Sequence, residues 1–174
     1  MRVKYSFCSG DVALDFVGTL QHRRSDQVER LATPEALARW VLDAGLLDAE
    51  PVVTLSDLDQ ARQLREAIYR LALGQGADSD RDIVNAAAAH PPATPRLTAT
   101  GVVVEGTLPS VLSDLARAAI RLLAGSSAVK ECEGPECTRL ILDTSRRGSR
   151  RWCDMRECGN RSKVAAYRAR RAPA

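Results

Sequence analysis

Four of the five cysteines lie in two matched pairs near the end of the chain. Cys132 and Cys137 are separated by four residues, Cys153 and Cys158 again by four, and fifteen residues lie between the pairs. Two short thiol pairs at this distance are typical of a structural zinc site, in which each pair supplies two corners of a tetrahedron. A small disulfide-bonded knuckle is the alternative, because four cysteines allow three pairings. We favour one structural zinc ion bound by all four cysteines, since thiols stay reduced in the cytoplasm.

The 174-residue chain has the composition of a globular protein, with 45% hydrophobic and 27% charged residues. That length suits one ordinary domain with a small appendage. No segment approaches the roughly 18 uninterrupted apolar residues of a membrane span, and residues 1–16 lack the apolar core of a signal peptide. We therefore expect a cytoplasmic protein with no membrane partner.

The charge is divided unevenly along the chain. Residues 139–174 carry eleven Lys or Arg against three acids, a balance of +8, whereas residues 1–138 carry fourteen against nineteen, a balance of −5. A polyanion is the natural partner of the basic end, although a solvated charged face is the alternative. The side chains expected to contact nucleic acid are Arg146, Arg147, Arg150, Arg151, Arg161, Lys163, Arg168, Arg170 and Arg171. Either DNA or RNA would satisfy this pattern.

Residues 1–125, the upstream module, predict an α+β fold that is mostly helical. Val12, Phe16 and Leu20 recur at helical spacing, and Asp11 is placed to cap that helix. Further helices are predicted over residues 33–44, 55–73, 80–90 and 109–123, with an antiparallel hairpin of two strands, 96–100 and 102–105. The Gly-Ser-Ser run at residues 125–127 indicates the boundary with residues 126–174, the terminal module.

The terminal module predicts a treble-clef-type zinc finger. A strand over residues 139–142 would pair with a returning strand over 150–152, and a basic helix would run from the last cysteine to about residue 171. Val164 and Tyr167 would pack that helix onto the hairpin. Four thiolates fill the coordination sphere and leave no position for water, so we expect a structural ion and no enzyme.

The same residues resemble a known family. The ligand spacing, the Arg151-Trp-Cys153 run and the Cys158-Gly-Asn-Arg161 tetrad are similar to the CGNR zinc finger over roughly the last 45 residues. Upstream, Phe7-x-x-Gly10-x-x-x-Leu14-Asp15-Phe16 and Leu-Ala-x-Trp40 resemble the ABATE domain of stress-induced bacterial transcription regulators. Where that family often has Asn-Thr, this chain has Gly18-Thr19. The resemblance implies a bacterial DNA-binding regulator whose upstream domain senses a small-molecule effector.

Two other functions compete with a transcription regulator. A treble-clef nuclease needs a histidine base, and residues 126–174 contain no histidine. An adaptor would use the zinc-stabilised finger to bind RNA or another protein, such as RNA polymerase or a sigma factor. For DNA binding, so short a finger would gain from a homodimer that reads two half-sites. Cys8, the remaining cysteine, is best interpreted as a buried core residue, with a redox sensor as the alternative.

Overall fold

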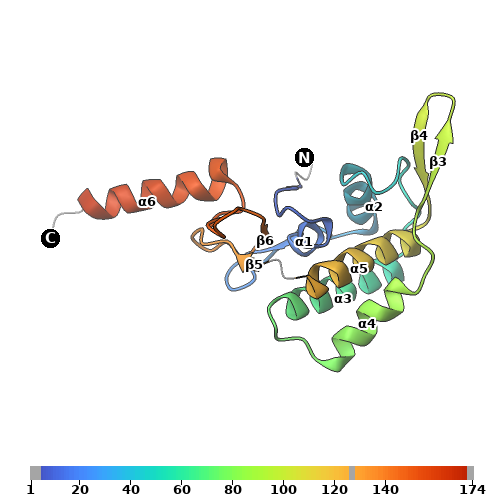
Figure 1. Ribbon diagram of the computed structural model, residues 1–174, viewed down its shortest axis with the longest axis horizontal. Coiled ribbons are helices and arrows are strands. Elements are labelled where there is room, and N and C mark those ends of the chain that lie inside the picture. The colour runs from blue at the N-terminus through green and yellow to red at the C-terminus, as the bar shows by residue number, and fades with distance from the viewer. Residues whose placement is uncertain (1–4, 126–127, 172–174) are drawn as a thin grey trace.

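The computed structural model describes residues 5–125 and 128–171 (Figure 1). Within them lie six α-helices and three two-stranded antiparallel sheets, which confirms the α+β class. Residues 126 and 127 of the predicted boundary lie outside the described residues. The helices are α1 Val12–Val17, α2 Pro34–Asp43, α3 Leu55–Ala72, α4 Asp78–Ala88, α5 Leu108–Ala124 and α6 Asn160–Arg171, with a π-turn η1 at Met155–Gly159. The sheets pair β1 Leu20–Gln21 with β2 Val28–Glu29, β3 Thr94–Thr98 with β4 Gly101–Glu105, and β5 Ala128–Glu131 with β6 Leu140–Asp143.

Helices α1, α3, α4 and α5 pack together and bury the main core (Figure 1). Leucine and alanine supply most of it, and the largest buried side chains are Trp40 of α2 and Phe16 of α1, whose ring centroids are 5.2 Å apart. Burial of such side chains provides most of the driving force for folding. The upstream module therefore has a hydrophobic core of its own.

The predicted helix starts in this module are confirmed by their caps. The side chains of Asp11, Thr33 and Thr54 accept the backbone N–H groups of residues 13, 36 and 57. Thr54 and Asp57 also form a reciprocal capping box. Short side-chain acceptors at these positions satisfy donors that the first turn of a helix leaves free.

The first helix is shorter than predicted. It ends at Val17, and Leu20 belongs to β1 instead of to the helical stripe. Gly18 N–H still bonds Leu14 C=O, but the Thr19 hydroxyl takes the carbonyl of Phe16 and turns the chain away. Local side-chain bonding of this kind competes with the helical pattern. Residues 21–29, for which no helix or strand was predicted, accordingly complete the small β1–β2 pair.

The partner of strand β6 differs from the prediction. β6 pairs with β5, from Ala128↔Asp143 to Glu131↔Leu140, and residues 150–152 form no strand. Asp143 explains the difference, because its carboxylate accepts the backbone N–H groups of Ser145 and Arg150. A strand at 150–152 would need that second N–H for its ladder. The treble-clef assignment as such stays a prediction.

Among the described residues, no helix is both long enough and apolar enough to cross a membrane.

Candidate metal centre and basic helix

The four paired cysteines converge on one point of the terminal module. Their Sγ atoms all lie within 4.8 Å of one another, and all four residues are buried. Cys132 and Cys137 bracket the knuckle between β5 and β6, whereas Cys153 precedes η1 and Cys158 lies within it. Each pair thus comes from a different turn of the chain, as the sequence spacing predicted.

The separations of the sulfur atoms fit a zinc ion. A tetrahedron with Zn–S bonds of about 2.3 Å has edges of about 3.8 Å. The Sγ atoms of Cys137 and Cys153 are 3.9 Å apart, and those of Cys153 and Cys158 are 3.5 Å apart. A disulfide bond would need about 2.05 Å, and all five cysteines are free. The site therefore fits one tetrahedral metal ion, and the disulfide alternative is wrong.

Backbone groups around the sulfurs favour thiolates. The N–H groups of Gly134 and Cys153 point at the Cys132 Sγ, 3.4 Å and 3.2 Å away. Cysteine binds metal as the thiolate, so these donors prepare the site for a cation.

Three of the predicted nucleic-acid contacts are engaged within the protein. The Arg150 guanidinium donates to the carbonyls of Cys8, Ser9, Leu142, Trp152 and Cys153. Arg161 Nη2 lies 3.3 Å from the Cys158 Sγ, and Arg151 pairs with Glu133 at 2.6 Å. The Arg150 side chain therefore points inward, and we leave it out of the surface proposed below.

The other six predicted side chains lie at the surface. Arg146 and Arg147 occupy the exposed turn after β6, and Lys163, Arg168, Arg170 and Arg171 lie on α6. None of the six makes an ion pair within residues 5–125 and 128–171. Arg156 on η1 was not predicted, but it lines a groove of about 640 Å³ along α6 together with Arg161 and Arg168. In the sequence, the position of Arg156 two residues before Cys158 was the feature that could have indicated a place on this surface.

Helix α6 extends away from the rest of the protein, on the side opposite the β3–β4 hairpin (Figure 1). Val164 is 48% exposed and Tyr167 is 49% exposed, so the predicted packing of these residues onto the hairpin is wrong. The helix follows directly from η1, and the position of Cys158 in the metal site fixes the point at which it leaves the body. The helix makes its main contacts with η1.

Comparison with family models agrees with this arrangement. Residues 10–126 match the model of the ABATE domain, described as "Putative stress-induced transcription regulator". The chain belongs to the ABATE family. Residues 128–171 match the CGNR zinc finger, so the four-cysteine site is that of a structural zinc ion. No curated protein matches the chain.

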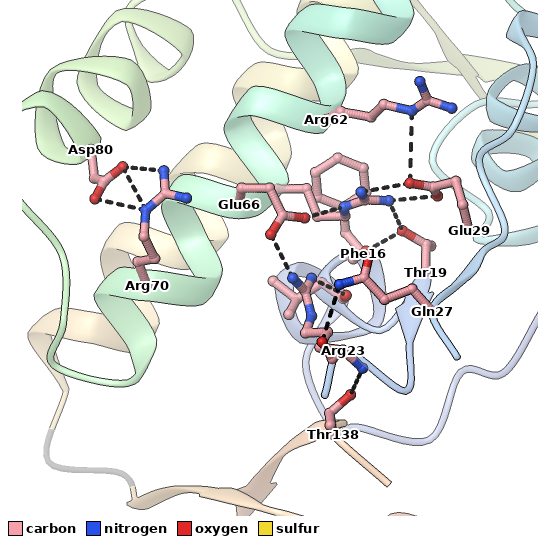
Figure 2. A network of polar contacts seen from close by, with 12 residues as sticks. Phe16, Thr19, Arg23, Gln27, Glu29, Arg62, Glu66, Arg70, Asp80 and Thr138 are labelled. Carbon is pink, nitrogen blue, oxygen red and sulfur yellow. Dashed lines mark hydrogen bonds and ion pairs between the residues drawn. The ribbon is translucent and has the colours of Figure 1, made fainter. Parts of the chain in front are cut away.

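The ABATE domain also contains a buried charge network that the sequence did not reveal (Figure 2). Arg65 of α3 is 2% exposed and binds both carboxylate oxygens of Glu29 at 2.7 Å, and its Nε donates to Glu66 at 2.8 Å. Glu66 in turn accepts Arg23 at 2.5 Å. Arg65 lies four residues after buried Ala61, on the buried stripe of α3, and a charge at that position was the signal for a partner.

Gly134 of the CGNR finger offers a local test of the metal site. A Cβ added there would lie 2.8 Å from both the Cβ and the Sγ of Cys158. Gly134→Ala is therefore expected to displace one ligand and to weaken zinc retention by about 10-fold or more. Competition with a chromogenic chelator measures this loss. Thr144→Ala is the control, because Thr144 lies exposed in the turn after β6, outside the group of four cysteines.

Proposed function

We propose that the chain is a transcription regulator that binds DNA through the CGNR finger, while the ABATE domain senses a small molecule. The family matches support a regulatory zinc-binding protein. In this proposal residues 1–125 carry the sensing role and residues 126–174 the DNA contact.

The observation that carries the proposal is the isolation of helix α6. Its 12 residues include five Lys or Arg and no acid, and nearly every side chain described in it is exposed. A helix of this length is marginal in water without tertiary packing, and its like charges repel one another. A polyanion would remove the repulsion and supply the missing contacts. The zinc site would hold the base of the helix rigid while it binds.

A second basic cluster extends the surface beyond α6. Arg146 and Arg147 lie in the exposed turn between β6 and Cys153, within the same finger. Contacts from two clusters suit successive phosphates along a backbone. Any of these arginines that reached a base edge could bind guanine through two hydrogen bonds.

The sensing role rests on a groove in the ABATE domain. It lies among α3, α4 and α5 and has a volume of about 470 Å³. Leu64, Ile83 and Leu112 contribute apolar surface, and Gln63 and His90 contribute polar groups. Apolar walls with a few polar groups are typical of small-molecule sites. The proposed effector is thus a small molecule with an apolar body and hydrogen-bonding ends.

Location and assembly follow from the same proposal. Thiols that must stay reduced to hold zinc favour the cytoplasm. A single short helix reads few base pairs, so two copies on adjacent half-sites would bind more tightly. We therefore propose a cytoplasmic regulator that binds DNA as a homodimer.

A protein or RNA partner is the second candidate. Met155, Val164 and Tyr167 are each about half exposed on η1 and α6, and an apolar contact with another protein would cover them. RNA would meet the same cations as DNA. Salt dependence distinguishes a protein partner from DNA, and competition by RNA distinguishes RNA from DNA.

Salt dependence tests the proposal. If four or more cations contact phosphates, the logarithm of the affinity should fall with log salt with a slope of about −4. Affinity for genomic DNA fragments should then drop on the order of 100-fold between 50 and 200 mM salt. Fluorescence anisotropy of the zinc-loaded chain measures the slope, with single-stranded RNA as the competitor. A flat salt dependence would favour the protein contact, and preferential competition by RNA would favour RNA.

A further inference from the structure

Strand β6 lies between the two hydrophobic clusters of the protein. Leu140 is fully buried in the core of the ABATE domain, whereas the next residue, Ile141, is fully buried against the four cysteines. Leu142 again packs against the upstream core. Alternate side chains of a strand point to opposite faces, so one short strand supports both modules. Strand β6 of the finger therefore contributes side chains to the hydrophobic clusters of both modules.

One arginine, Arg150, connects the finger to the upstream module through hydrogen bonds. The Arg150 guanidinium has five N–H donors, and its nitrogens make five hydrogen bonds to carbonyl oxygens. Nε binds Trp152, Nη1 binds Ser9 and Leu142, and Nη2 binds Cys8 and Cys153. The same nitrogen thus holds the carbonyl of a zinc ligand and the carbonyl of a residue in the upstream module.

The upstream segment at this contact, residues 6–9, is fixed by further bonds. Ser9 N–H binds the Asp15 carboxylate at 2.9 Å, and Ser9 C=O accepts Leu142 N–H at 2.8 Å. Arg139, next to β6, donates to the Ser6 hydroxyl at 3.0 Å and to the Cys8 sulfur at 3.5 Å. Segment 6–9 is therefore bonded to strand β6 and, through Arg150, to the carbonyl of Cys153.

A second upstream segment holds the first cysteine pair. Arg23 N–H donates to the Thr138 hydroxyl at 3.1 Å, directly beside Cys137, and His22 Nδ1 lies 3.0 Å from Glu136 O. Arg24 forms an ion pair with Glu131. The Arg23 guanidinium reaches the other way, to Glu66 of α3 (Figure 2). Segment 22–24 thus connects the zinc knuckle to the helical core.

We propose that segments 6–9 and 22–24 of the upstream module complete the zinc site, so that zinc retention and the conformation of that module are thermodynamically coupled. Segment 22–24 binds residues next to Cys132 and Cys137, and segment 6–9 is joined to the carbonyl of Cys153 through Arg150. Coupling of this kind is reciprocal. A change that displaces either segment weakens the hold on zinc, and loss of zinc frees both segments. The coupling involves the zinc site alone and is independent of DNA binding.

Arg150→Met in the full-length, zinc-loaded chain tests this coupling from the side of the finger. We expect zinc release to 4-(2-pyridylazo)resorcinol to accelerate about 10- to 100-fold, as for other residues that orient metal ligands. Arg147→Met is the matched control, because Arg147 lies in the exposed turn and makes no ion pair within the described chain. Release at the wild-type rate from a folded Arg150→Met protein would overturn the proposal.

A pair of upstream variants keeps the test decisive if Arg150→Met does not fold. Asp15 and Asp57 each accept a backbone N–H at 2.9 Å, from Ser9 and Thr54, but only Asp15 lies beside the finger. Asp15→Ala is expected to accelerate zinc release severalfold, whereas Asp57→Ala leaves it unchanged. Hydrogen exchange of the wild-type chain should show faster exchange at the N–H groups of residues 9, 23 and 142 after zinc removal. Equal release from both variants, or unchanged exchange, would contradict the coupling.

Discussion

Cys158→Ser is expected to abolish stoichiometric zinc binding and to unfold the finger while the helices of the ABATE domain persist. The finger has few apolar residues, and its cluster consists mainly of Ile141 and the cysteines. Zinc binding to isolated fingers is worth about 10–16 kcal/mol and appears as folding energy. The upstream core, in contrast, consists mainly of residues of the upstream module, among them Trp40 and Phe16, so we expect it to persist without the metal. Metal analysis and hydrogen exchange by mass spectrometry measure both effects.

Cys8→Ser is the matched control for this experiment. Cys8 lies against the cysteine cluster but does not belong to the group of four sulfur atoms. The variant should keep one zinc per chain, because Arg150 binds the backbone carbonyl of residue 8 and the serine hydroxyl can accept the Arg139 N–H in place of the sulfur. The exchange protection of α6 and β6 should stay close to that of the wild type. Retention of a full zinc equivalent by Cys158→Ser would show that another set of ligands holds the ion.

The triple variant Arg147→Glu, Lys163→Glu and Arg168→Glu is expected to abolish DNA retention in gel-shift experiments. These exposed residues belong to both basic clusters, and none donates a hydrogen bond to a zinc ligand within residues 5–125 and 128–171. Three phosphate contacts become repulsive, so the affinity should fall by more than about 100-fold. Zinc content and thermal stability should remain close to those of the wild type.

The control for charge itself is the triple variant Arg81→Glu, Arg96→Glu and Arg121→Glu. It changes the net charge by the same amount on exposed positions of α4, β3 and α5. DNA retention should fall only slightly, because charges away from the finger are screened at physiological salt. Equal losses in both triple variants would point to nonspecific electrostatics, and unchanged binding in the first would favour a protein partner.

The sequence predicted the parts of the protein that follow from local rules. Thiol spacing gave the zinc site, because a tetrahedral ion needs four donors on two short turns. The predicted Asp11 cap placed the start of α1, since a capping bond is local. The Gly-Ser-Ser boundary stays a prediction.

Features that depend on distant contacts could not be predicted. Arg150 and Arg147 look alike in the sequence, yet only Arg150 meets carbonyls of residues 8 and 9, about 140 positions away. The strand expected over residues 150–152 failed because the Asp143 carboxylate captures Arg150 N–H. Val164 and Tyr167 have the spacing of a packed stripe, but the projecting helix leaves both about half exposed. Charge and periodicity alone do not tell which surface a side chain faces.

The most direct test of the account removes zinc stepwise with a chelator and records bound zinc and retained DNA in the same samples. DNA retention is expected to fall in parallel with zinc content and to return when zinc is restored, because the metal fixes the base of the basic helix. Full DNA retention by the zinc-free protein would contradict it.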